Sequence, residues 1–442
     1  MRWTYTLLMY LYLPWALAHV AARGFRDRGY WRGLTERLGF GRRLPQRRPA
    51  VHAPRIWVHA VSVGEVQAAW PLLRALLAAD EPPELIVTTT TATGAERLRA
   101  LVPSEVMQRY APYDVPGAVK RFLDRADPDL GIIFETEIWP NWLDACRRRD
   151  IDMLYANVRL SERSAGGYRR LARLIAPALG SVAGIAAQTP DDARRLVTIG
   201  APSERLKVTG STKFDVGLSP SVMEAGEVLR RSLGVDRSVW IAASTHEGEE
   251  ELVLDAFAAI RREHPRCLLL LVPRHPERFA RVGAVAARRG YRVGLRSDPD
   301  TLLVPCDVFL GDSMGELPVF YCASDVAFVG GSLVNVGGHN FLEPASAGIP
   351  IVMGPYLHNF ADIAGRLSKL GAAFEVANAT ELAERVASLL HDANARQASG
   401  ERGRHFVESN RGACARLLAM AGEVLQSRRD SRSGDPSRSE DR

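Results

Sequence analysis

Residues 57–73, WVHAVSVGEVQAAWPLL, and residues 240–257, WIAASTHEGEEELVLDAF, share one layout. Each is an apolar run typical of a buried strand, then a turn of small residues with glycine and glutamate, then a run with helical spacing. A strand that leads directly into a helix is the opening unit of a doubly wound α/β domain. The two similar openings predict two such domains that face each other across a cleft.

Strand and helix patterns alternate on both sides of these stretches, which predicts parallel sheets with helices on both faces. The alternation breaks at residues 216–224, so the join between the halves is expected between 215 and 235. The expected helices of the first half are 65–79, 94–101, 138–149 and 190–199. The expected strands are 55–61, 84–90, 130–135, 152–157, 183–188 and 205–209, then 239–244, 267–272, 308–310, 325–330, 349–354 and 372–376.

Composition narrows the class of protein. The chain has 442 residues, of which 46% are hydrophobic and 24% are charged, and this balance excludes a disordered or collagen-like chain. The net charge is +6, but residues 1–50 hold ten arginines against two acidic residues, so the remainder is slightly negative and does not indicate a nucleic-acid-binding body. The five scattered cysteines form no C-x-x-C pair, which argues for a reducing compartment and against a zinc site.

The N-terminus has the character of a membrane segment. Residues 3–22 carry no full charge and could extend about 30 Å as a helix, although Pro14 and His19 weaken a clean span. Nine arginines follow between residues 23 and 48, which favours a cytoplasmic body touching anionic headgroups over an exported one. A buried N-terminal helix is the alternative. The stretch from 427 has no apolar residue and is predicted to be disordered.

Polar residues follow the expected strands of the first half, where ligands bind in open α/β sheets. Glu65 opens a helix after the first strand, although a glutamate is common in a first helical turn. Glu135 and Glu137 follow the run GIIF; because they are two apart, we expect them to point to opposite faces, so that only one meets the cleft. Lys213 is one of only four lysines and is expected at the edge of the cleft.

The second half has the features of a phosphate-binding site. Arg274 stands among prolines after an expected strand, and glycines cluster between residues 311 and 338, where exposed N–H groups could hold an anion. Asn340 and Glu343 have the spacing of a capping box, so a purely structural role is also open to them. A complete P-loop, H-E-x-x-H and a Cys/His cluster are all absent from the sequence, so no metal site is indicated.

Nine motifs in order resemble the 3-deoxy-D-manno-octulosonic acid (Kdo) transferase family, glycosyltransferase family 30. They cover nearly the whole body, from about residue 57 to 360: VHAVSVGE, TTTTATG, YAPYDVP, FETEIWPN, NVRLSERS, VTGSTKFD, PRHPERF, GDSMGEL and GGHNFLEPA. The resemblance implies a GT-B fold of two Rossmann-like domains with parallel sheets, preceded by an N-terminal membrane-anchor helix. The expected parts are an anchor and basic segment (1–48), an acceptor domain (49–218), a donor domain (219–426) and a tail (427–442).

The resemblance also implies the reaction. The family transfers Kdo from CMP-Kdo to the lipid A precursor lipid IVA during lipopolysaccharide biosynthesis, with inversion and without a metal or cofactor. The membrane partner is the cytoplasmic face of the inner membrane, through a single-pass or interfacial anchor. By motif, the catalytic residues are Glu65 as the base, Glu135 or Glu137, and Lys213; the donor-binding residues are Pro273, Arg274, Met314, Gly315, Glu316, Asn340, Phe341, Leu342 and Glu343.

The residues by themselves do not exclude two other functions. One is a GT-B transferase that uses a UDP-sugar and a lipid acceptor. The other is a membrane-anchored nucleotide-binding adaptor without turnover, although such a protein would have no need of Glu65, Lys213 and Arg274 together.

Overall fold

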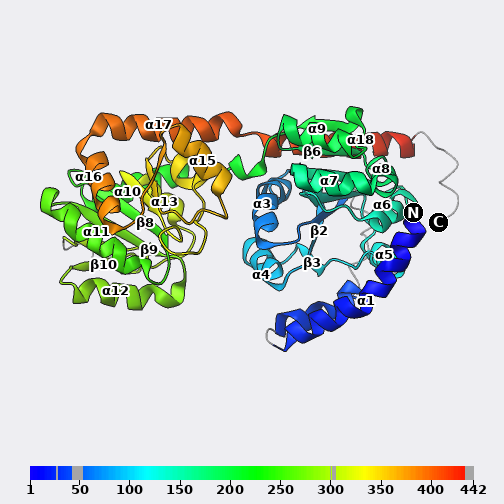
Figure 1. The fold of residues 1–442 in the computed structure, drawn as a ribbon, viewed down its shortest axis with the longest axis horizontal. Helices are drawn as coiled ribbons and strands as arrows, with labels where there is room; N and C mark the ends of the chain where they lie inside the picture. Colours follow the sequence, from blue (N-terminus) through cyan, green and yellow to red (C-terminus); the bar gives the residue numbers. More distant parts are fainter. Residues whose placement is uncertain (26–27, 42–52, 299, 301–304, 434–442) are drawn as a thin grey trace. The chain divides into compact units, whose positions relative to one another are not determined.

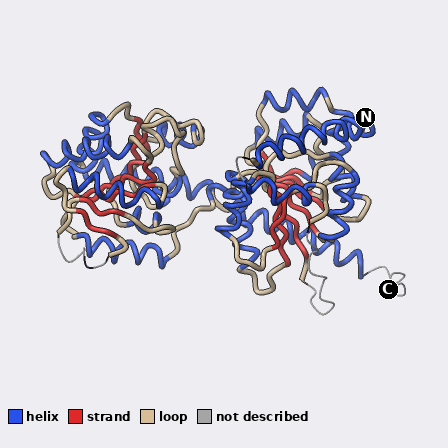
Figure 2. Tube along the Cα trace, turned by 90° about the horizontal axis from the view of Figure 1, so that it is seen from below, coloured by secondary structure: helices blue, strands red, loops and turns tan. Residues whose placement is uncertain are grey.

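Two units make up the protein (Figure 1). The computed structural model describes residues 1–442 except 26–27, 42–52, 299, 301–304 and 434–442. Unit 1 contains Met1–Asp215 together with Arg411–Arg442, and unit 2 contains Val216–Asn410. Each unit is built on one parallel seven-stranded sheet, and Figure 2 shows the strands of each unit in red among blue helices.

The sheet of unit 1 is buried on both faces. Its central strands are continuous apolar runs because a parallel sheet is covered by helices on either side. In spatial order the strands are β3 (Met107–Tyr110), β2 (Glu84–Thr89), β1 (Arg55–His59), β4 (Leu130–Phe134), β5 (Asp152–Val158), β6 (Gly184–Ala187) and β7 (Leu206–Val208). The chain reverses its direction of winding between β1 and β4, which is the topological switch point where such sheets bind ligands.

Helices form the two outer layers of unit 1. One layer packs on side chains such as Ile56, Val58 and Ile132, and the other packs on Trp57 and Ile133. The first layer contains α3 (Val63–Leu77), α4 (Ala92–Leu101) and α18 (Ala413–Ser433). The second contains α5 (Pro116–Ala126), α6 (Pro140–Arg147), α7 (Glu162–Arg170), α8 (Ala172–Leu179) and α9 (Pro190–Thr198). Two short 3-10 turns, η2 (Ser203–Arg205) and η3 (Thr212–Phe214), flank β7.

Unit 2 repeats this architecture, with its switch point between β8 and β12. The strand order is β10 (Val293–Leu295), β11 (Val308–Leu310), β9 (Leu268–Pro273), β8 (Val239–Thr245), β12 (Val326–Val329), β13 (Ile351–Met353) and β14 (Ala373–Glu375). One face carries α11 (Glu249–Glu263), α12 (Phe279–Arg288) and α16 (Ala379–His391), and the other carries α10 (Pro220–Leu233) and α13 (Leu317–Cys322). The remaining elements are η4 (Pro276–Arg278), α14 (Leu342–Ser346), α15 (Ala361–Lys369) and α17 (Ala393–Asn410).

The two parallel sheets and the join near Asp215 agree with the sequence pattern, but the edge strands β3 and β10 were not predicted. The residues of β3, MQRY, are mostly half-buried and polar, so they lack the apolar run that marks a central strand. β10 has only three residues, one of which is a glycine. Edge strands need fewer apolar side chains because the sheet covers them less completely.

The C-terminus corrects the expected domain limits. Residues 411–426 were assigned to the donor domain and 427–442 to a disordered tail, but α18 runs from Ala413 to Ser433 and belongs to unit 1 (Figure 1). Leu417 and Met420 are buried in the core beneath α3. The apolar side chains in the first turns of α18 are buried and hold the helix in place. The polar residues after 427 then only extend a helix that has already formed. Residues 434–442 lie outside the described residues.

The N-terminal elements lie against unit 1. They are α1 (Arg2–Gly24), η1 (Arg28–Gly33) and α2 (Leu34–Arg37). Arg37 is buried, donates to the Thr90 carbonyl at 2.6 Å and lies over the Tyr110 ring, so the prediction that it meets lipid headgroups was wrong. Of the other arginines expected at the membrane, five fall outside the described residues: Arg26, Arg42, Arg43, Arg47 and Arg48.

Replacing Leu417 by alanine should destabilise unit 1. The side chain is 2% exposed, and truncating a buried leucine costs about 2–5 kcal/mol. Leu171→Ala is the matched control, since that leucine is exposed and its loss should change the free energy of unfolding by about 0.5 kcal/mol or less. Urea unfolding of both variants measures this. Equal effects would mean that α18 is not part of the unit 1 core.

Candidate active site

Glu65 lies at the switch point of unit 1, in the first turn of α3. The strand β1 ends at His59, and the short turn that follows places the glutamate at the carboxyl edge of the sheet. Its Oε2 accepts a hydrogen bond from the Val61 N–H at 2.8 Å, and its Oε1 accepts one from the Ser62 hydroxyl at 3.2 Å. The side chain is 8% exposed, so the carboxylate is held rigidly and is largely shielded from water.

Glu135 and Glu137 follow β4, the strand beside β1. The prediction that they point to opposite faces assumed an extended strand, but β4 ends at Phe134 and Glu135 adopts a left-handed φ of +59°. Alternation therefore stops before the first of them, and both carboxylates act electrostatically on Glu65. The Tyr155 hydroxyl donates to the Glu137 carbonyl at 2.9 Å and holds this segment against β5.

This acidic cluster, Glu65, Glu135 and Glu137, changes how Glu65 titrates. Burial, together with the two neighbouring carboxylates, raises the pKa of Glu65 to about 7 against the opposing effect of the Val61 and Ser62 hydrogen bonds. Burial and the proximity of Glu135 likewise raise the pKa of Glu137. A carboxylate with a pKa near neutrality can take a proton at physiological pH and is suited to general-base work.

Lys213 is exposed in the turn η3, which packs against α3. The turn is fixed by Asn157 near the end of β5, whose Oδ1 accepts a hydrogen bond from the Thr212 N–H at 3.1 Å. Asn157 is fully buried and has a left-handed φ of +55°. Non-glycine residues in this conformation cost about 1–3 kcal/mol and gather at functional sites. Asn157 was not predicted as a site residue from the sequence, because an asparagine inside a strand gives no signal of its own.

In unit 2, Pro273 is the last residue of β9, and Arg274 follows it. The Arg274 N–H donates to the Thr245 carbonyl at 3.0 Å, which places the arginine beside the end of β8. Three histidines gather nearby. The His246 and His339 rings stack at 5.0 Å with their Nε2 atoms 2.7 Å apart, and His275 meets His246 edge-on. Burial, with the nearby histidines and Arg274, lowers the pKa of His339 to about 4, so this imidazole is neutral at pH 7.

The segment of Met314, Gly315 and Glu316 leads into α13. Met314 is exposed, and Gly315 has a φ of +87°, a conformation that suits glycine. Glu316 is paired with Arg296, with an N–O distance of 2.6 Å, and that guanidinium lowers the pKa of the carboxyl. Its charge is therefore already balanced within the protein.

The segment from Asn340 to Glu343 opens α14. The Asn340 amide donates to Glu343 Oε1 at 3.0 Å, and its Oδ1 accepts from the Leu342 N–H. The N-cap residue of α14 is Phe341, so Asn340 and Glu343 contact each other but do not form a capping box. Phe341 and Leu342 are buried in the core of unit 2, and their side chains support the segment from within. Only their backbone can meet a ligand.

Glu249 was not singled out from the sequence. It follows β8 as Glu65 follows β1, but its buried carboxylate accepts hydrogen bonds from four N–H groups: His246, Gly331, Ser332 and Leu333. These bonds join the loops after β8 and β12 at the switch point of unit 2. Gly330 is required there, because a Cβ would lie 2.7 Å from the Ser244 carbonyl oxygen.

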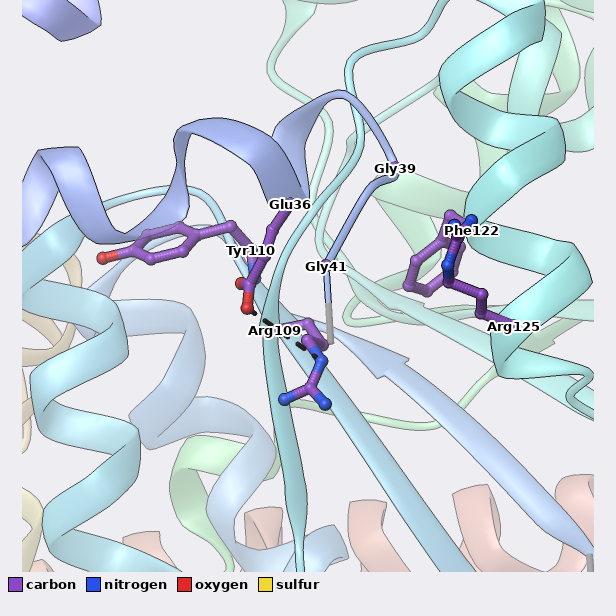
Figure 3. A pocket seen from close by; sticks show the side chains of 7 residues that line it. All are labelled: Glu36, Gly39, Gly41, Arg109, Tyr110, Phe122 and Arg125. Atoms are coloured by element: carbon purple, nitrogen blue, oxygen red, sulfur yellow. Dashed lines mark hydrogen bonds and ion pairs between the residues drawn. The ribbon is translucent and has the colours of Figure 1, made fainter. Parts of the chain in front are cut away.

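Among the described residues, no group of three or more His, Cys, Asp or Glu side chains is placed to hold a metal ion. A pocket in unit 1 lies at the β3 edge of the sheet, where Glu36 pairs with Arg109 (Figure 3). None of the predicted site residues lines this pocket, so no function is assigned to it.

Comparisons with known proteins decide the family. A family model described as 3-deoxy-D-manno-octulosonic-acid transferase matches residues 32–216, and one described as glycosyl transferases group 1 matches residues 241–406. The Haemophilus influenzae 3-deoxy-D-manno-octulosonic acid transferase is 37% identical over 96% of this chain and 99% of its own length. The enzyme of the same name from Bordetella pertussis is 38% identical over 94% of this chain and 98% of its own length.

The chain belongs to the 3-deoxy-D-manno-octulosonic acid transferase family. It is a glycosyltransferase that transfers Kdo, so the adaptor hypothesis falls away. The UDP-GlcNAc 2-epimerase of Neisseria meningitidis has a similar fold, with a TM-score of 0.52 and 13% identity over 84% of this chain and 100% of that one. The predicted GT-B fold is confirmed.

Replacing Glu65 by glutamine in this Kdo transferase should lower kcat by roughly 10²–10⁴, because the amide cannot accept a proton. In the wild type, kcat should fall as the pH drops below about 7, where Glu65 becomes protonated. The raised pKa means that Glu65 stabilises the fold only in its protonated form, an effect lost as the pH rises through about 7. The Tm of Glu65→Gln at pH 8 should therefore not be below that of the wild type.

Steady-state kinetics, CMP affinity and melting of the same variant measure these effects, with the exposed Glu96→Gln on α4 as the control. Turnover close to the wild-type rate would move the base to Glu135 or Glu137. Loss of CMP binding or a large fall in Tm would make Glu65 a structural residue instead.

Proposed function

We propose that this chain transfers Kdo from CMP-Kdo to the lipid A precursor lipid IVA in lipopolysaccharide biosynthesis, with inversion at the anomeric carbon and without a metal ion or cofactor. The observation that carries the proposal is the acidic cluster, in which Glu65 is buried with a pKa of about 7. Its support also includes the family relationship over nearly the full chain.

Glu65 is proposed to act as the general base. Its carboxylate would take the proton from a glucosamine hydroxyl of the acceptor as that oxygen attacks the anomeric carbon of Kdo. Glu135 and Glu137 raise the basicity of Glu65 and would stabilise the positive charge that develops on the sugar ring in an oxocarbenium-like transition state. A single displacement of this kind inverts the anomeric centre and needs no covalent nucleophile.

The donor is proposed to bind in unit 2. The departing CMP carries a phosphate whose negative charge grows as the glycosidic bond breaks. Arg274 offers a planar fork of donors for such a phosphate, and the neutral His246–His339 pair offers N–H groups without a further charge. Lys213 is the proposed additional cation of unit 1. Stabilisation by fixed cations and dipoles takes the place that a divalent metal has in other transferases.

The deciding experiment is incubation of the protein with CMP-Kdo and lipid IVA, followed by mass spectrometry of the lipid product. Addition of Kdo, abolished in Glu65→Gln, supports the proposal. Transfer of a sugar from a UDP-linked donor in competition with CMP-Kdo would favour the other GT-B hypothesis. The product masses also count the Kdo units added.

Arg274→Ala should impair use of CMP-Kdo far more than use of lipid IVA. A charge-assisted pair with phosphate contributes about 1.5–3 kcal/mol, which corresponds to roughly a 10- to 150-fold loss in kcat/KM for the donor. Arg262→Ala on α11 is the matched control at an exposed arginine. Unchanged donor kinetics for Arg274→Ala would assign Arg274 to a structural turn.

Membrane attachment is proposed to occur through α1, at the cytoplasmic face of the inner membrane. By length and composition α1 is the one helix among the described residues that could cross a membrane. One stripe along the helix is partly shielded: Arg2, Tyr5 and Met9 are half-buried, and Ala16 and Gly24 are buried. The opposite face is apolar and exposed: Trp3, Leu7, Leu8, Leu11 and Trp15. This two-faced burial favours an interfacial helix that lies in the membrane surface over a spanning one.

Replacing Leu7, Leu8 and Leu11 together by serine should weaken binding to phosphatidylethanolamine–phosphatidylglycerol vesicles by more than about tenfold, since each leucine buries several CH₂ groups in lipid. The free energy of unfolding should not fall, because the three side chains are exposed. Leu370→Ser at an exposed site of unit 2 is the control. Vesicle flotation measures both, and undiminished binding of the triple variant would contradict the interfacial helix.

A further inference from the structure

Helix α1 is joined to unit 1 by polar side chains that lipid binding does not require. The Tyr5 hydroxyl donates to Asp114 Oδ2 at 2.8 Å, and the Thr6 hydroxyl donates to Asn141 Oδ1 at 2.9 Å. Asn141 lies in the first turn of α6, and Asp114 lies just before α5 and accepts hydrogen bonds from that turn of α6. A helix that served only as an anchor could meet the body through apolar contacts, as α1 does further along at Ala16.

Asp114 is the centre of this contact. It is 1% exposed, and its carboxylate accepts the Trp142 N–H at 2.8 Å and the Asn141 N–H at 3.2 Å. These are N–H groups of the first turn of α6, which have no partner within the helix. The Asn141 side-chain amide donates back to the Asp114 carbonyl at 2.8 Å. Burial raises the pKa of Asp114 to about 6, and the Tyr5 hydroxyl and the two N–H groups oppose that rise.

The start of α6 is coupled to the acidic cluster by a short, stiff connection. α6 begins at Pro140, three residues after Glu137, and proline restricts the backbone of the residue before it. The other end of the connection is held by the Tyr155 hydroxyl on the Glu137 carbonyl. Trp142, in the first turn of α6, also packs edge-on against His59 at the end of β1, with ring centroids 4.9 Å apart. A displacement of the first turn of α6 therefore reaches Glu137 directly.

We propose that Tyr5 and Thr6 are positioning residues for Kdo transfer: their hydroxyl groups fix the first turn of α6 and, through it, the segment that carries Glu135 and Glu137. The N-terminal helix then serves the reaction as well as attachment, and the acidic cluster takes its working geometry only when α1 is docked. This inference rests on the proposed roles of the acidic cluster.

The test is the full-length double variant Tyr5→Phe/Thr6→Val, which removes two hydroxyl groups and keeps the apolar character of α1. The matched control is Tyr12→Phe/Thr4→Val, the same changes at exposed positions of the same helix. The first variant should lower kcat roughly tenfold or more while the donor KM and vesicle binding stay as in the wild type, and the control should leave all three unchanged. Thr6→Ser should retain the wild-type kcat.

Two further readouts separate positioning from a merely structural role. Losing the Tyr5 donor raises the pKa of Asp114, so the double variant should lose additional kcat at low pH, beyond the fall that protonation of Glu65 causes in the wild type. Hydrogen exchange at the amides of Asn141 and Trp142 should become faster, and this readout does not depend on activity.

Equal kcat and equal amide exchange in the double variant and its control would overturn the inference. A fall in kcat that is matched by a fall in vesicle binding would also overturn it, since α1 would then act only as a tether. If Glu65→Gln keeps its turnover, the proposed function fails instead, whereas the amide exchange still reports whether α1 holds α6.

Discussion

Three carboxylates held together at the end of a buried parallel sheet are the constraint on which unit 1 depends. Glu65, Glu135 and Glu137 repel one another, and burial makes the charged forms of Glu65 and Glu137 costlier still. The backbone after β1 and β4 holds them together. The Val61 N–H binds the Glu65 carboxylate, and the left-handed conformation of Glu135 ends β4 and changes the direction of the chain. The strain and repulsion stored there are offset by the apolar core on both faces of the sheet. The outcome is a carboxylate with a pKa of about 7, suited to taking a proton.

Unit 2 shows what the same position becomes when hydrogen-bond donors surround it. Glu249 follows β8 as Glu65 follows β1, yet four backbone N–H groups bind its carboxylate and join two loops into one rigid edge. A carboxylate so fully bonded has no lone pair to spare for a substrate proton. Glu65 accepts only one N–H and one hydroxyl, so its environment rather than its residue type supports the proposal that it is the base.

Both ends of the chain complete unit 1. α18 returns after unit 2 to pack Leu417 and Met420 beside α3, the helix that carries Glu65. α1 approaches from the other side and binds the start of α6, which follows the second and third carboxylates. The two helices that flank the acidic cluster are thus each supported by a terminal segment. This arrangement gives a physical reason why an enzyme with the proposed lipid acceptor would join the proposed membrane helix to the edge of the sheet that carries the acidic cluster.

The sequence by itself determined the two parallel α/β units, the join near residue 215 and most of the strands, because continuous apolar runs and their helical partners are local patterns. It also placed Glu65 and Arg274, whose positions directly after strands can be recognised from the spacing of the apolar runs. Only the tertiary structure decided that Glu135 and Glu137 both act on Glu65, since that depends on a single left-handed residue that ends the strand. Only the tertiary structure showed that Arg37 is buried and that residues 411–433 return to unit 1. Both depend on contacts between segments far apart in the chain, where apolar burial and hydrogen bonds outweigh local charge and composition.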